Sequence, residues 1–187
     1  MITLNTIQRE GKVKSEINAL RRTGHIPYVL YSKGAVAEIG SIVSQEMEAA
    51  MRSLRPGFLP TTIFSLKDAS GRERKVIVKE IQYKPTTYQI IHLDFFELID
   101  SNIVQIKVPV EFLNAVDCVG VKLGGFLRHS MRHVKVSCFP KDIPTHFEID
   151  VKDLDLNQHR KVKDLQIPQG VTCLAKPEDI VVAVVKK

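Results

Sequence analysis

A strict alternation of apolar and polar residues at 104–112 constrains the fold of this chain more than any other feature. The apolar positions are Val104, Ile106, Val108, Val110 and Phe112. Because successive side chains of a strand point to opposite faces, this period of two predicts a strand with one face in a core. Pro109 lies within the run and predicts an edge position, since proline cannot donate to a neighbouring strand.

Other short runs predict further strands in both halves of the chain. In the second half, residues 134–138 and 147–151 resemble half-buried strands, and residues 180–185 are apolar throughout, which is typical of a strand buried on both faces. In the first half, residues 76–78 and 90–96 predict a long hairpin that turns around Lys84-Pro85-Thr86-Thr87. The chain is therefore expected to be mainly β, in an α+β arrangement.

Helical spacing of apolar residues is confined to two short segments. The first, residues 44–54, is expected to be an amphipathic helix capped by Ser44 and ended before Pro56-Gly57. The second spans residues 15–22 and stops at Gly24; its apolar residues would face the protein and leave Arg21 and Arg22 free. Both patterns fit small helices that accompany a sheet.

The length of 187 residues is enough for two modest domains. Turn-forming residues at 98–102 mark the junction, so we predict domains at 1–98 and 99–187. No apolar stretch approaches the length of a membrane span, and the first residues do not resemble a secretion signal, which predicts a cytoplasmic protein with no membrane partner. The widely spaced Cys118, Cys138 and Cys173 are expected to be reduced core thiols.

Positive charge is concentrated in residues 9–33, here called the basic arm. It holds six basic residues and two acidic ones, a net charge of +4 of the chain's total of +6. The basic members are Arg9, Lys12, Lys14, Arg21, Arg22 and Lys33. Because several clustered cations can neutralise phosphates, the arm indicates nucleic-acid binding; the alternative is an ordinary charged helix face.

His92 and Asp94 lie two residues apart in the last strand pattern of the first half and should project from the same face. Such a pair could hydrogen-bond riboses or base edges, or it could be a solvated face with no partner. Catalysis is not expected, because the chain has no Gly-x-Ser-x-Gly elbow. His129 and His133 lack the glutamate of a zinc protease helix. We therefore predict no enzyme activity, no metal, no cofactor and no small-molecule substrate.

Several segments closely resemble the bacterial large-subunit ribosomal protein twenty-five family in its long form, also known as the general stress protein CTC. In the first half they read RRTGHIPYVLY at 21–31, VIVKEIQYKP at 76–85 and IHLDFF at 91–96. In the second half they read GVKLGGFL at 120–127 and DIPTHFEIDV at 142–151. The resemblance implies an N-terminal small β-barrel with short helices that binds 5S rRNA, followed by a second β-rich domain. Packing of that second domain against other components of the large ribosomal subunit is a separate hypothesis based on the fold alone.

The resemblance also implies RNA contacts, at Arg9, Lys14, Arg21, Tyr31, Gln82, His92 and Asp94. Lys12 and Arg22 of the basic arm complete the candidate RNA-binding set. The basic residues would hold phosphates, Tyr31 could stack or donate a hydrogen bond, and Gln82 could contact a base or sugar edge. With the resemblance, a functional role for His92 and Asp94 is favoured over a solvated face.

The chain departs from the family pattern at residues 13–18, which read VKSEIN. The family usually has a Gly-Lys-Gly-Ala-like stretch and then an arginine; here Glu16 adds negative charge and Asn18 replaces the arginine. Lys12 or Arg22 could compensate. Two other functions remain open: a stress-induced protein-interaction module acting off the ribosome through the second domain, and, more remotely, a nuclease built on His92 and Asp94.

Overall fold

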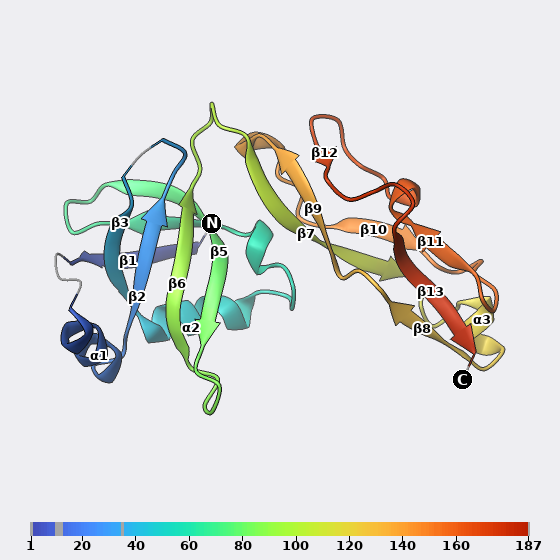
Figure 1. Cartoon of the computed structure of the whole chain (residues 1–187), viewed down its shortest axis with the longest axis horizontal. Coiled ribbons are helices and arrows are strands. Elements are labelled where there is room, and N and C mark those ends of the chain that lie inside the picture. The colour runs from blue at the N-terminus through green and yellow to red at the C-terminus, as the bar shows by residue number, and fades with distance from the viewer. Residues whose placement is uncertain (1, 10–12, 35, 187) are drawn as a thin grey trace. The chain divides into compact units, whose positions relative to one another are not determined.

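The computed structural model describes residues 2–9, 13–34 and 36–186. The chain divides into two compact units, residues 1–102 and 103–187, and strands dominate both of them, which confirms the prediction of a mainly β protein. The predicted junction after residue 98 lies in the segment between the last strand of the first unit, β6 (Ile90–Glu97), and the first strand of the second, β7 (Val104–Leu113) (Figure 1).

The first unit is a closed β-barrel. Around the barrel the strands follow the order β1 (Ile2–Gln8), β3 (Glu38–Val43), β2 (His25–Tyr31), β6, β5 (Glu73–Tyr83) and β4 (Ile63–Lys67). The pairs β2–β6 and β1–β4 are parallel, and the β1–β4 pair closes the barrel, so neither end of the sheet is left as a free edge. The predicted hairpin is confirmed as the antiparallel pair β5–β6.

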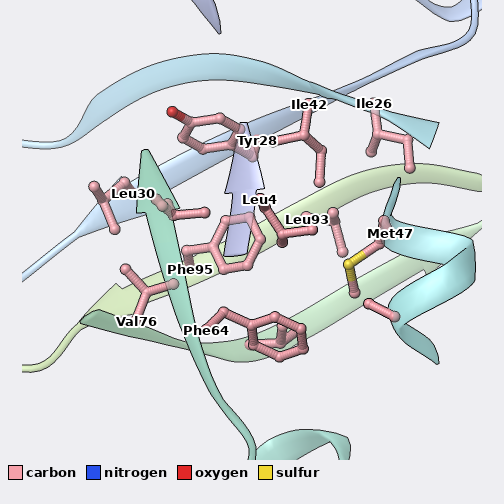
Figure 2. Close-up of a cluster of buried hydrophobic side chains, with 13 residues drawn as sticks. Leu4, Ile26, Tyr28, Leu30, Ile42, Met47, Phe64, Val76, Leu93 and Phe95 are labelled. Carbon is pink, nitrogen blue, oxygen red and sulfur yellow. The ribbon is translucent and has the colours of Figure 1, made fainter. Parts of the chain in front are cut away.

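Apolar side chains on the inner face of these strands fill the barrel (Figure 2). Phe64 and Phe95 are fully buried, and Phe95 meets the ring of Tyr28 edge-on with centroids 5.5 Å apart. Helix α2 (Ser44–Ser53) packs Met47 against the same cluster. Because Phe95 points inward, its neighbour on β6, Asp94, must point outward.

The expected helices are both present, with one correction. Helix α1 (Lys14–Arg22) and helix α2 agree with the predicted segments. Ser44, however, does not cap α2: it is the first helical residue, and its Oγ donates to Glu48 Oε1 at 2.8 Å. Strand β3 runs directly into the helix, and the backbone N–H of Ser44 donates to the carbonyl of Gly24 at 2.9 Å. A 3-10 turn, η1 (Leu59–Thr61), precedes β4.

The second unit contains two small sheets. One has the order β10 (Phe147–Asp150), β7, β9 (His133–Cys138), β12 (Thr172–Cys173), and the other has the order β11 (His159–Lys161), β13 (Ile180–Lys186), β8 (Gly125–His129). Helix α3 (Val119–Lys122) and the 3-10 turns η2 (Pro140–Asp142) and η3 (Val162–Asp164) connect the strands. The alternating set on β7 confirms its predicted core face, because Val104, Ile106 and Val108 are all buried.

Two predictions about this unit need correction or restriction. Strand β7 is not at an edge, since β9 and β10 flank it. The proline is tolerated because Val110, the next residue, donates its N–H toward β9. Because neighbouring residues of a strand direct their N–H groups to opposite sides, the nitrogen of Pro109 faces β10. Strand β10 pairs with β7 only from Val110 onward, so no hydrogen bond is lost at Pro109. On β13, Val181 and Val182 are both buried, as predicted for a strand covered on two faces, but Ile180 is exposed.

Arg74 on β5 joins two carboxylates at one end of the barrel, on the same face of the strand as the buried Val76. Its Nη2 atom lies 2.7 Å from Oε2 of Glu38 and 3.3 Å from Oδ2 of Asp68. The hydrogen bond from Arg74 is the main cause that lowers the pKa of Glu38. The guanidinium is mostly covered, whereas the Glu38 side chain is 49% exposed, so solvent weakens the pair.

Replacing Arg74 with methionine is expected to lower the free energy of unfolding by about 1–2 kcal/mol at neutral pH, because two carboxylates lose their cation. A carboxyl whose folded pKa is depressed stabilises the fold above its unfolded pKa and loses that contribution as pH falls through the folded value. Urea unfolding should therefore show a gap between wild type and R74M that shrinks in acid. Lys75→Met is the matched control, and an equal loss there would contradict the account.

The cysteines are free thiols; Cys118 and Cys138 are buried and Cys173 is half-buried. Within the described residues, no group of His, Cys, Asp and Glu is arranged to hold a metal ion. In the same part of the chain, no helix is long and apolar enough to cross a membrane.

Candidate nucleic-acid interface

Four of the sequence-predicted residues come together on the outside of the barrel. Strand β6 lies between β5 and β2 and carries both His92 and Asp94. His92 is the partner of Gln82 on β5, and Asp94 has a partner residue on each of the two neighbouring strands. Tyr31 of β2 pairs with Phe96, two residues along β6 from Asp94, and so shares its face. We call Tyr31, Gln82, His92 and Asp94 the polar face.

His92 and Asp94 contact each other at the centre of this face. Nδ1 of His92 lies 2.9 Å from Oδ1 of Asp94, and the side chains are 19% and 30% exposed. The two atoms are close but lack the alignment of a hydrogen bond, so Nδ1 of His92 has no hydrogen-bond partner within the described residues. Asp94 makes no hydrogen bond through Oδ2 within the described residues. This oxygen can therefore accept a hydrogen bond from an incoming hydroxyl.

Tyr31 borders the pair and has a raised pKa. The causes are burial, which is the largest, and then the negative charges of Asp94 and Glu80. The phenol therefore stays protonated at neutral pH and can donate a hydrogen bond. Its ring packs edge-on against Phe96, with centroids 5.6 Å apart, so the hydroxyl is held by a rigid support.

Lys79 belongs to the same surface, although sequence analysis did not select it. Strand β5 shifts its register between Val78 and Glu80, and Lys79 is the extra residue at this β-bulge. Its Nζ lies 5.1 Å from the centroid of the Phe96 ring. A β-bulge has no clear sequence signal, so the position of this cation could not be anticipated.

Arg21 connects the basic arm to the polar face. The prediction that its side chain is free is wrong: Nε donates to the carbonyl of Ile91 at 3.1 Å, and Nη1 donates to Oδ1 of Asn18 at 3.4 Å. Ile91 precedes His92 on β6. The last turn of α1 is therefore fixed beside the start of that strand, and the guanidinium keeps donors for a phosphate.

The other basic candidates are placed differently. Lys14 and Arg22 are the first and last residues of α1 and are exposed. Arg9 follows β1, which β3 and β2 separate from β6, so the structure does not bring it into the polar face. Its backbone N–H donates to the carbonyl of Ile39 at 3.4 Å. Lys12 lies outside the described residues.

A hollow of about 550 Å³ opens beside Arg21. Its walls come from α1, from the start of β2 and α2, and from the β5–β6 hairpin. Six polar residues that line it were not among the predicted RNA-binding residues, namely Asn18, His25, Ser44, Glu48, Lys84 and Gln89. The cations on its walls outnumber the acids, since Arg21, Arg22 and Lys84 face only Glu48.

Some cations elsewhere in the chain are paired with acids. Arg74 is paired with acids on the barrel, and in the second unit Lys122 lies 2.9 Å from Asp117. Arg22 and Lys84 have no acidic partner among the described residues. Unpaired cations next to hydrogen-bonding side chains are suited to a polyanion that also offers hydroxyl groups.

Comparisons with known proteins identify the family of this chain. Residues 4–95 match the model of the ribosomal L25p family, and residues 103–187 match that of the ribosomal protein TL5 C-terminal domain. Relatives named large ribosomal subunit protein bL25 include those of Chlamydia abortus, Chlamydia trachomatis serovar A and Chlamydia pneumoniae. They are 44%, 42% and 40% identical over 179 residues, which is 96% of this chain and of each relative. The chain therefore belongs to the bL25 family of large ribosomal subunit proteins, in the long form that carries a TL5-type C-terminal domain.

Proposed function

We propose that this protein binds 5S rRNA as a structural, non-catalytic component of the large ribosomal subunit in the cytoplasm. The observation that carries the proposal is the hydrogen bond that fixes Arg21 beside β6. Because Arg21 is bonded to the start of the strand that carries His92 and Asp94, this strand offers hydrogen-bonding groups beside a cation suited to phosphate.

The chemistry of the polar face is suited to folded RNA. Tyr31 is a donor, Asp94 is an acceptor, and the exposed Gln82 amide is both, so the face can contact ribose hydroxyls as well as base edges. Recognition would then depend on RNA shape and 2′-hydroxyls, with phosphate contacts from Arg21 and Lys14 adding affinity. DNA of the same sequence would lack the hydroxyls and should bind less tightly.

The test is a titration of the full chain with folded 5S rRNA and with an unrelated structured RNA of equal length, over a series of salt concentrations. We expect tight and selective binding that weakens linearly on a logarithmic salt scale, because cations released from phosphates drive association. Equal, weak binding to both RNAs would contradict the proposal. It would favour the stress-induced interaction module, and the second unit would then be searched for a protein partner.

A further inference from the structure

The loop that joins β5 to β6 has an unusual conformation. It projects beyond the end of the barrel where α1 lies (Figure 1). Lys84 donates its N–H to the carbonyl of Gln89, and Tyr88 donates to the carbonyl of Lys84, both at 2.8 Å. Tyr88 has a φ of +54°, in the left-handed region that bulky residues rarely adopt. The turn is therefore tight and hydrogen-bonded, and it imposes strain on a large residue.

The strain is not offset by packing of the tyrosine. The side chain of Tyr88 is 80% exposed, so burial of the ring contributes little to folding. Strained, non-glycine backbone occurs preferentially at functional sites. An aromatic ring held out on such a turn offers a face for stacking, and because Tyr has few rotatable bonds the entropy lost on binding is small.

The surroundings of Tyr88 indicate which ligand the ring would meet. A second hollow, of about 330 Å³, lies between the turn and α2 and is lined by Tyr88 and Arg52. It shares Glu48, Gln89 and Ile90 with the basic hollow beside Arg21. The two hollows therefore adjoin, and together they lead from α1 across the hairpin to the exposed ring.

The charge along this path is positive. Lys84 and Arg52 have no acidic partner among the described residues, and they extend the row of cations that begins at Arg21 and Arg22. The acid on the path, Glu48, already accepts a hydrogen bond from Ser44. A row of unpaired cations that ends at an exposed aromatic ring is the combination used to bind an unstacked nucleotide and its phosphates.

We infer that the tip of the β5–β6 hairpin is a second RNA contact, where Lys84 binds a phosphate and Tyr88 stacks on an unpaired base of the same RNA. The inference rests on the proposed function, because the RNA must already be held by the polar face. It adds a contact whose partner is a nucleotide outside a continuous helix, since a base within a stacked duplex has no free face.

The test compares the affinities of single variants of the full chain for folded 5S rRNA. Tyr88→Asn removes the ring, yet asparagine tolerates a positive φ, so the turn is kept. We expect it to weaken binding about tenfold, whereas Tyr88→Trp should keep most of the affinity. Lys84→Gln should weaken binding about threefold and reduce the logarithmic salt slope by about one. Thermal unfolding of each variant should show that the fold is retained.

Lys67→Gln is the matched control for charge. Lys67 is an exposed lysine of the same unit, on β4, away from both hollows, and its loss should change the affinity less than about twofold. If wild type binds 5S rRNA selectively and both Tyr88→Asn and Lys84→Gln bind as tightly as Lys67→Gln, the inference is overturned while the proposed function stands. If wild type itself shows no selectivity, both are overturned.

Discussion

Replacing Arg21 with alanine is expected to weaken the binding of 5S rRNA by about 10- to 100-fold and to reduce the logarithmic salt slope by about one. The loss exceeds that of an ordinary surface cation because Arg21 is already ordered. Its Nε is bonded to the carbonyl of Ile91, so less side-chain entropy is lost when the guanidinium meets a phosphate. The variant also removes the link between α1 and β6.

Two further variants separate these contributions. Arg22→Ala removes the same charge from the same helix but from a side chain with no bond to β6, and we expect a loss of only about threefold. Arg21→Lys keeps the charge but cannot present a forked set of donors, so its affinity should fall between those of wild type and R21A. Fluorescence titration at two salt concentrations would measure all three. Equal losses for R21A and R22A would show that the ordering of Arg21 has no effect.

Replacing Phe95 with alanine is expected to lower the free energy of unfolding by about 3–5 kcal/mol, because a fully buried ring leaves a cavity in the barrel. The effect should extend to function. Phe95 follows Asp94 on β6, and its contact with Tyr28 joins the strands β6 and β2 that carry most of the polar face. Loosening this contact should reduce RNA affinity even where the variant remains folded.

Phe95→Leu is the matched control, since it keeps an apolar side chain of similar reach and should cost much less stability. Urea unfolding followed by circular dichroism would give both values. RNA affinity would be measured at a temperature where each variant is folded. A Phe95→Ala variant with wild-type stability would show that the ring is not part of the core. Wild-type affinity in a destabilised variant would show that the polar face does not depend on it.

Much of the fold could be predicted because strand patterns depend on local periodicity. The alternation in β7 and the hairpin of β5 and β6 agree with the structure, and so does the outward placement of His92 with Asp94. The predictions that were wrong concern features that depend on tertiary contacts. The role of Pro109 depended on which strand its nitrogen faces, and Ser44 does not cap α2 because β3 continues up to Val43 and makes Ser44 the first helical residue. Neither feature is visible in a local pattern.

The candidate site was predictable to a similar extent. Residues two apart on one strand share a face, and strand pairing then brought Gln82 and Tyr31 beside them. The bond from Arg21 to Ile91 joins residues that are 70 positions apart in the chain. The hollow at Lys84 and the bulge at Lys79 likewise depend on how the elements of the barrel pack and pair. Long-range geometry of this kind cannot be derived from spacing along one segment.

The most direct test of the central claim, that RNA binds the polar face and the adjoining hollow, is lysine footprinting of the full chain by acetylation and mass spectrometry, with and without 5S rRNA. We expect protection of Lys14, Lys79 and Lys84, with unchanged labelling of Lys67, which is on another strand of the barrel, and of Lys122, which belongs to the second unit. Protection confined to lysines of the second unit, or equal protection of Lys67 and Lys84, would contradict the account.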